Sequence, residues 1–215
     1  MINEMRNKTV HDHVRVVIFD CDGVMFDSRE ANRAYYNAIL DHFGKPLLSD
    51  SDLEIAHMST AEESTDHLFR DDPRRSEAQD YRRQLDYRQW LGLLRMEPHL
   101  QAVLATLKSR FRLAVATNRT TTMSMILTIF NLEKYFDFVV SALNVTNPKP
   151  HPEPLLKILE HFSVNASQAI YVGDSVIDYE VCRLTNVRFI AYKNPQLKAA
   201  CHIGDHRELL PLLSL

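Results

Sequence analysis

Cysteine is scarce in this sequence, with only three residues, Cys21, Cys182 and Cys201, among 215. Their odd number and wide spacing exclude a disulfide framework and a zinc-binding pattern, and they are typical of a reducing cytoplasm. No apolar run is long enough to span a membrane. The polar residues 1–13 lack the apolar stretch of a signal peptide, so we interpret them as a loose tail.

An excess of positive charge is also missing. The chain has 25 Lys and Arg residues against 28 Asp and Glu residues, which gives a net charge of −3. Nucleic acids and anionic membranes are therefore not expected as partners, because nothing supplies the basic field that attracts them. The hydrophobic fraction of 45% is that of a globular protein with a sizeable core.

Short apolar segments alternate with segments of helical periodicity through most of the chain. The apolar segments are rich in β-branched residues and end in polar residues, which predicts buried parallel strands. Strands followed by helices predict a doubly wound α/β sheet. The predicted strands are 14–20, 112–117, 138–140, 169–173 and 187–191, and a short helix near 209–212 closes the chain.

One long stretch interrupts this alternation. Residues 49–96 show no strand signal, and the patterns predict a helix over 31–39, another over 56–69 and a long one over 73–94. We therefore predict an all-helical insertion at 28–96. The core would then consist of 14–27 and 97–215.

Polar side chains stand where three of the predicted strands end, and a lysine lies in a rigid loop with three prolines. Because the carboxyl ends of parallel strands share one edge of a sheet, we expect these groups to converge. Two close carboxylates repel each other unless a cation or a proton lies between them. The groups are Asp20 and Asp22, Thr117 and Asn118, Asp174, and Lys149 from the loop.

Four motifs in this order resemble those of the haloacid dehalogenase (HAD) superfamily. They are Asp20-x-Asp22-Gly23, Thr117-Asn118, Lys149-Pro150 and Gly173-Asp174-Ser175-x-x-Asp178. The Asp-x-Asp-Gly-x-x-x-Asp-Ser start is similar to that of the phosphoglycolate phosphatase-like branch. This resemblance implies a Rossmann-like core and identifies the helical insertion as a small cap.

The resemblance also implies a phosphatase and a role for each motif. Asp20 would be the nucleophile that forms an aspartyl-phosphate. Asp22 would protonate the leaving oxygen and then take a proton from the hydrolytic water. Lys149 would neutralise developing charge, and Thr117 and Asn118 would hydrogen-bond the phosphoryl oxygens.

The cofactor implied is Mg²⁺, which prefers oxygen ligands in an octahedral arrangement. The Asp20 carboxylate, the main-chain carbonyl of Asp22 and the Asp174 carboxylate would bind the ion. Asp178 lies one helical turn beyond Asp174 and would hold a metal-bound water.

The sequence departs from the family pattern after Asp178, where relatives often have an alanine and then an alanine-glycine pair. Cys182 and Thr185-Asn186 take these places. Asn tolerates the left-handed backbone conformation nearly as Gly does, so we expect the turn to survive. Cys182 is expected to pack against the sheet, and Cys21 to point away from the cleft as a core thiol.

The predicted cap is rich in arginine in its second half, interleaved with acids, which favours a solvated surface of mixed charge. A minority of these arginines remain candidates for binding a substrate carboxylate or second phosphate. His57 and Arg70 are the first positions we would substitute to test cap contacts. The arginines are Arg70, Arg74, Arg75, Arg82, Arg83, Arg88 and Arg95.

Several other functions on the same fold remain open. A sugar phosphomutase would call for a histidine where Asn32 stands, a phosphonatase for a cap lysine such as Lys45, and a dehalogenase would not need Asp22. A non-enzymatic binding or regulatory module is a further alternative. We favour a cytoplasmic phosphatase of a small soluble phosphorylated metabolite, and the sequence leaves the oligomeric state undetermined.

Overall fold

The computed structural model describes residues 13–215, so the predicted loose tail lies, apart from His13, outside the described residues. Six parallel strands form one sheet in the order β5-β4-β1-β6-β7-β8, which confirms the α/β prediction. The strands are β1 Val16–Phe19, β4 Arg112–Ala116, β5 Phe138–Val140, β6 Ala169–Gly173, β7 Arg188–Tyr192 and β8 Cys201–Ile203.

Strand β1 occupies the middle of the sheet, between β4 and β6. Its four side chains are fully buried, since both faces of the sheet are covered. Val17 and Phe19 belong to one hydrophobic cluster, whereas Val16 and Ile18 belong to the other. This two-sided burial explains why the strand is a continuous apolar run instead of an alternating pattern.

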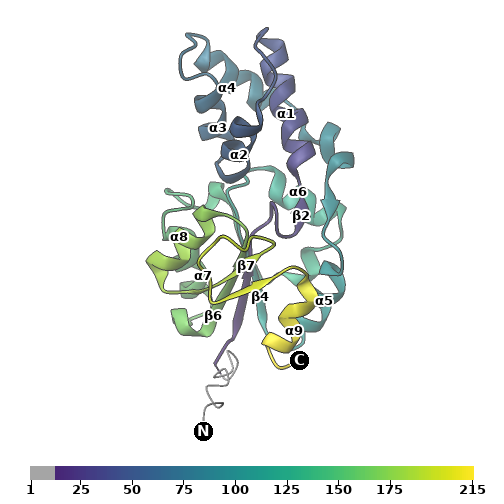
Figure 1. Cartoon of the computed structure of the whole chain (residues 1–215), viewed down its shortest axis with the longest axis vertical. Helices are drawn as coiled ribbons and strands as arrows, with labels where there is room; N and C mark the ends of the chain where they lie inside the picture. The colour runs from purple at the N-terminus through teal and green to yellow at the C-terminus, as the bar shows by residue number, and fades with distance from the viewer. Residues whose placement is uncertain (1–12) are drawn as a thin grey trace.

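Helices cover both faces of the sheet (Figure 1). The cluster that contains Phe19 includes residues of α5 Leu100–Lys108, α6 Thr122–Ile129 and α9 Leu209–Leu212. The opposite cluster includes residues of α7 Glu153–His161 and α8 Val176–Thr185. Short 3-10 helices link these elements: η2 Glu133–Tyr135, η3 Ala142–Asn144, η4 Ala166–Gln168 and η5 His206–Glu208.

The remaining helices stand beyond the carboxyl ends of the strands, at the top of Figure 1. They are α1 Arg29–His42, α2 Asp50–Met58, α3 Ala61–Leu68, α4 Arg75–Gln84 and the 3-10 helix η1 Tyr87–Leu93. The chain leaves the core through β2 Phe26–Asp27 and returns through β3 Arg95–Met96, which pair antiparallel. The division into a core and a cap at 28–96 remains a proposal.

The structure corrects three details of the predicted insertion. Strand β3 was missed, because two residues carry no periodic signal. The predicted helix 73–94 ends at Gln84, where Leu85 adopts an extended conformation and Asp86 caps the 3-10 helix that follows. The predicted helix 56–69 is divided at Ser59 and Thr60, where the sequence also indicates a break between cap helices, and Thr60 caps α3 through a capping box.

The C-terminal segment, whose strand β8 was also missed, returns to the loop that follows β1. Strand β8 has three residues and only Ile203 is buried, so it lacks an apolar run. Beyond it, the fully buried His206 is hydrogen-bonded through Nε2 to the Val24 carbonyl over 2.8 Å. A neutral ring with its proton on Nε2 donates this bond, and the ring stacks on Tyr192 at 4.4 Å. Among residues 13–215, no helix is both long and apolar enough to cross a membrane.

Helix α8 ends as the sequence predicted. Asn186 adopts the left-handed conformation, with φ of 58° and ψ of 21°, and is exposed. An Asn186→Ala substitution should lower the free energy of unfolding by about 1 kcal/mol, because a Cβ without a polar group is disfavoured there. Asn186→Gly should be at least as stable as the wild type. Urea unfolding measures both variants, and equal stability of the Ala and Gly proteins would contradict this account.

Replacing His206 by Phe should keep ring stacking but leave the Val24 carbonyl unpaired, which costs about 1–3 kcal/mol. His206→Gln, which retains a donor, should lose less. Burial lowers the pKa of His206 although the Val24 contact opposes this. The unfolded chain therefore binds a proton that the folded protein resists, and stability should fall as the pH drops below about 6.5.

Measuring the free energy of unfolding between pH 7 and pH 5 separates the titration of His206 from a simple loss of packing. In His206→Phe the contribution of this imidazole is absent, so stability should fall less between pH 7 and pH 5 than in the wild type. A fall of the same size in both proteins would show that His206 does not titrate with unfolding.

Candidate active site

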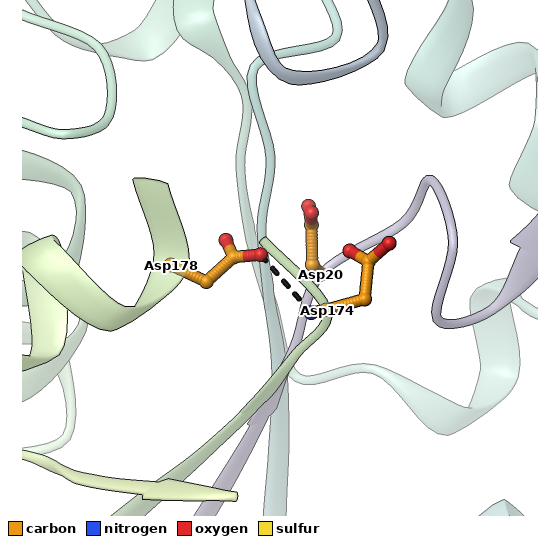
Figure 2. A group of neighbouring side chains, drawn as sticks. All are labelled: Asp20, Asp174 and Asp178. Carbon is orange, nitrogen blue, oxygen red and sulfur yellow. Dashed lines mark hydrogen bonds between the residues drawn. The ribbon is translucent and has the colours of Figure 1, made fainter. Parts of the chain in front are cut away.

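The predicted strand-end residues come together at the carboxyl edge of the sheet. Asp20 directly follows β1, Thr117 follows β4, and Asp174 follows β6. Figure 2 shows the carboxyl groups of Asp20, Asp174 and Asp178 gathered at this edge. Asp20 is only 7% exposed, and Asp178 is completely buried.

The loop after Asp22 packs directly on Asp174. Gly23 has a φ of 73°, and a Cβ at this position would collide with the Asp174 carboxylate. Glycine is therefore required here for two reasons: the left-handed backbone and the close approach of a charged side chain.

The side chain of Asn118 fixes the proline-rich loop that carries Lys149. Its oxygen accepts a hydrogen bond from the Lys149 amide over 3.0 Å, and its nitrogen donates to the Lys149 carbonyl over 2.9 Å. The same nitrogen donates to the carbonyl of Met58, the last residue of α2, over 3.0 Å. Asn118 thus links the strand end, the loop and the helices above them.

The Lys149 ammonium lies among two carboxylates and a hydroxyl. It is 2.9 Å from Oδ1 of Asp20, without hydrogen-bond geometry, and 2.7 Å from Oδ1 of Asp178. It also donates to the Tyr171 hydroxyl over 2.8 Å. Burial lowers the pKa of Lys149, but Asp178 and Asp20 outweigh burial and raise it overall, so the group stays charged.

Asp178 receives hydrogen bonds on both carboxylate oxygens. Lys149 and Tyr171 donate to Oδ1, and the amides of Asp174 and Ser175 and the Ser175 hydroxyl donate to Oδ2. Ser175 and Asp178 form the capping box of α8, so a local helix signal also builds the site. These donors, with Lys149 foremost, outweigh burial and lower the pKa of Asp178.

The pKa values of Asp20 and Asp174 shift in the opposite direction to that of Asp178. Burial raises the pKa of Asp20 to about 7 despite Lys149, and burial and the Asp178 charge raise that of Asp174. Oxygens of all three carboxylates lie within 4.8 Å of one another. With a single ammonium beside them, the ionised cluster carries two uncompensated negative charges. This donor set fits a hard divalent cation such as Mg²⁺.

Asp22 is held by a different set of groups. Its Oδ1 accepts hydrogen bonds from the Ser28 hydroxyl and, over 2.5 Å, from the Arg119 guanidinium. Burial raises the pKa of Asp22, but the charges of Arg119 and His57 outweigh burial and lower it. Arg119 was missed by the sequence reasoning, although its position directly after Thr117-Asn118 was a usable signal.

A cavity of about 590 Å³ joins this edge to the helices above it. Asp20, Asp22 and Lys149 line it from the sheet, and His57 and Asn32 line it from α2 and α1. Nε2 of His57 is 4.0 Å from Oδ2 of Asp174, so His57, one of the two cap positions chosen for substitution, faces the cavity beside the acidic cluster.

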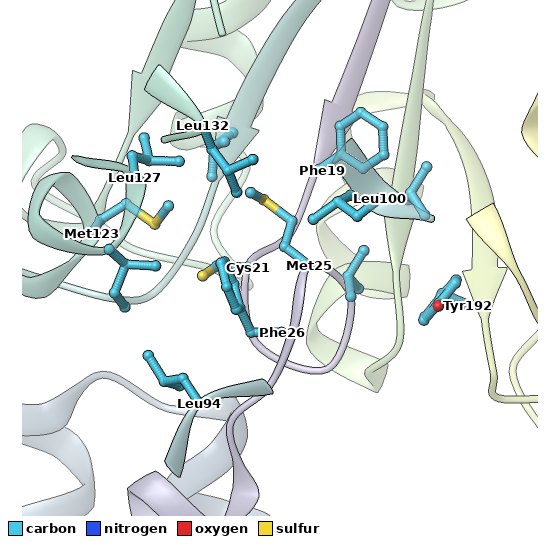
Figure 3. Packing of buried hydrophobic residues seen from close by; sticks show 14 of the residues in the cluster. Phe19, Cys21, Met25, Phe26, Leu94, Leu100, Met123, Leu127, Leu132 and Tyr192 are labelled. Atoms are coloured by element: carbon cyan, nitrogen blue, oxygen red, sulfur yellow. The ribbon is translucent and has the colours of Figure 1, made fainter. Parts of the chain in front are cut away.

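Other residues singled out in the sequence lie elsewhere. Arg70 does not line the cavity: its exposed side chain pairs with Asp71, and the expectation of a cleft contact at Arg70 was wrong. Lys45 instead packs on the ring of Phe69. Cys21 and Cys182 are buried in opposite hydrophobic clusters, as expected, and Figure 3 shows Cys21 within its cluster. Burial raises the pKa of both thiols.

Comparison with known proteins agrees with this geometry. A phosphorylated carbohydrates phosphatase of Thermotoga maritima is 28% identical over 182 residues, which cover 82% of this chain and 84% of that protein. A phosphoglycolate phosphatase of Nitrosococcus oceani is 33% identical over 95 residues, which cover 43% of this chain and 42% of that protein. The second match therefore spans less than half of that relative.

Solved structures are similar over almost the whole chain. A HAD-superfamily hydrolase of subfamily IA from Geobacter sulfurreducens has 44% identity and a TM-score of 0.82, covering 93% of this chain and 100% of that one. CbbY from Rhodobacter sphaeroides, solved with phosphate, has 18% identity and a TM-score of 0.79, covering 94% and 100%, and shares the fold. The sequence profile of the haloacid dehalogenase-like hydrolases matches residues 17–192. With the motifs and the strand-end site in place, the chain belongs to this family of hydrolases.

Proposed function

We propose that the protein is a Mg²⁺-dependent phosphatase that hydrolyses a small soluble phosphomonoester through an aspartyl-phosphate. One observation carries the proposal: the Asp20 carboxylate lines the cavity beside the Lys149 ammonium, with the second carboxylate of Asp22 two residues away. A nucleophile, a fixed cation and a separate acid/base group are the parts that this chemistry needs.

In the first half of the reaction, a carboxylate oxygen of Asp20 attacks phosphorus and the bond to the leaving oxygen breaks. Asp22 gives its proton to that oxygen. In the second half, water attacks the aspartyl-phosphate, Asp22 accepts the proton, and Asp20 and inorganic phosphate are released. Arg119 keeps Asp22 ionised at rest, so substrate entry must loosen this ion pair and Asp22 must take up a proton from solvent before it can act as an acid.

The charge of the transferred phosphoryl group requires positive partners. Lys149 supplies one, because its raised pKa keeps it protonated while Asp20 reacts. Thr117 and Asn118, at the end of β4, are proposed to hydrogen-bond the phosphoryl oxygens. Since the Asn118 carboxamide bonds Lys149 and Met58, its main-chain amide is the group we assign to this contact.

We assign the metal to the Asp20 and Asp174 carboxylates and the Asp22 main-chain carbonyl, with Asp178 acting through a water. When bound, Mg²⁺ would neutralise the acidic cluster and polarise the phosphoryl oxygens. The raised pKa of Asp20 supports this assignment, because a nearby cation would restore the ionised form that attacks phosphorus.

The size of the cavity and the names of the relatives support a small phosphorylated metabolite as substrate. The net charge of −3 gives no reason to propose a nucleic acid or membrane partner. We further propose that residues 28–96 form a cap that excludes water and selects the substrate, because groups at the strand ends contact only features common to all phosphomonoesters. The free Cys21, Cys182 and Cys201 support a cytoplasmic location.

Replacing the nucleophile tests the proposal directly. Asp20→Asn should lower phosphate release from an aryl phosphate by about 10³-fold or more, because the amide cannot attack phosphorus. The matched control is Asp71→Asn, whose side chain is 93% exposed, and it should retain full activity. Circular dichroism verifies that both variants are folded. Substantial turnover by a verified Asp20→Asn preparation would rule out covalent catalysis at this residue.

Removal of the metal tests the cofactor. Treatment with EDTA should abolish turnover, and added Mg²⁺ should restore it. Mg²⁺ should also raise the midpoint of thermal unfolding at neutral pH, since the ion binds the folded acidic cluster and not the unfolded chain. Undiminished activity of metal-free protein would overturn the metal assignment.

A further inference from the structure

Arg82 and Arg95 differ from the other cap arginines in having no ion pair with a described residue, and of these two only Arg82 lines the cavity. Most of the arginines in the second half of the cap have an acidic partner: Arg70 with Asp71, Arg74 with Asp72, Arg75 with Asp66, Arg83 with Asp80, and Arg88 with Asp86. Arg82, which lines the cavity, has no carboxylate within 4.0 Å among the residues that the structure describes. It is only partly exposed.

The orientation of Arg82 is fixed by neutral groups. Its Nε donates to the side-chain oxygen of Gln79 over 2.8 Å. Gln79 is buried, and its nitrogen donates to the Glu62 carbonyl and to Asp66, so this acceptor is held in place. Arg82 also contacts the Tyr35 hydroxyl, where its charge opposes the burial that raises the pKa of Tyr35 to about 12. A guanidinium has five N–H donors, so these two contacts leave donors unused.

A chain of contacts connects Arg82 to the proposed acid/base group. The rings of Tyr35 and Tyr87 lie 5.5 Å apart. The Tyr87 hydroxyl accepts a hydrogen bond from Arg119 over 3.3 Å, and Arg119 binds Asp22. Arg82 therefore stands on the cavity wall that continues from Asp22. Because Asp22 would protonate the leaving oxygen, this wall faces the leaving group.

We propose that Arg82 binds a second anionic group, a carboxylate or a phosphate, on the leaving group of the substrate. The inference rests on the proposed phosphatase function and deepens it. The other two arginines that line the cavity are already paired, Arg119 with Asp22 and Arg83 with Asp80, whereas the Arg82 charge is available. A guanidinium fork matches the two oxygens of such a group, and a partly buried cation gains from the pairing.

Three aryl phosphates test this assignment: phenyl phosphate, 4-carboxyphenyl phosphate and 1,4-phenylene bisphosphate. Arg82→Gln should lower kcat/KM about 10-fold or more for at least one of the two substrates with a second anion, chiefly through KM, but less than about threefold for phenyl phosphate. Arg82→Lys, which keeps the charge, should recover part of the loss. Whichever anionic substrate is more affected identifies the group that Arg82 recognises.

Two further variants control for general effects of charge. Arg70→Gln removes an exposed cap arginine that does not line the cavity, and it should leave the ranking of the three substrates unchanged. Glu62, an acid that lines the cavity, should repel the second anion, so Glu62→Gln should lower KM for the same substrates. An equal loss of kcat/KM on all three substrates in Arg82→Gln would overturn the proposal. So would an Arg70→Gln protein whose losses match those of Arg82→Gln.

A binding measurement separates this inference from the proposed reaction. Calorimetric titration of the Asp20→Asn protein with 4-carboxyphenyl phosphate and with 1,4-phenylene bisphosphate needs no turnover. In the Asp20→Asn background, Arg82→Gln should weaken binding about 10-fold for the ligand that the kinetics single out. The same substitution should weaken binding of phenyl phosphate much less. If the wild type hydrolyses none of the three substrates and Arg82→Gln still weakens binding of the ligand with the second anion selectively, the proposed reaction is wrong and the anion site stands. If hydrolysis occurs without the difference, the anion site is wrong.

Discussion

The arrangement of the site depends on a single buried ammonium. Lys149 lies between Asp20 and Asp178, and it therefore joins the end of β1, the proline-rich loop and the start of α8. A buried charge without its partner costs several kcal/mol, so each of these segments is held where its charge is compensated. Asp174 adds a third carboxylate that the lysine does not neutralise, and this imbalance makes the strand ends suited to a divalent cation.

The helices above the sheet are connected to this cluster by polar contacts. The Asn118 carboxamide binds both the Lys149 loop and the last residue of α2, and Arg119 joins Asp22 to Tyr87 in η1. These contacts fix the position of the helices that form the cavity wall relative to the strand ends. In the proposed mechanism, the groups that would treat all phosphomonoesters alike come from the sheet, whereas Arg82, the proposed contact to the leaving group, comes from the helices.

Sequence reasoning predicted five of the six strands of the sheet and the convergence of the polar residues that end three of them, because both depend on local signals. Strands buried on two faces are short apolar runs, and the polar residues that end them fall on one edge in any parallel sheet. Asp20, Thr117 and Asp174 could therefore be placed before their contacts were known. The left-handed turn at Asn186 was likewise predictable, since it depends on one residue type at a helix end.

The amino-acid sequence by itself determined the α/β order, the strand-end residues and the run of helices between β2 and β3. Only the tertiary structure decided which charges meet. Arg119 and Asp22 are 97 residues apart and His206 and Val24 are 182 apart, so no local pattern reports either pair. Likewise, Arg70 and Arg82 belong to the same run of cap charges, yet only Arg82 lines the cavity. The physical reason is that periodicity reports burial along one segment, whereas pairing depends on how separate segments pack.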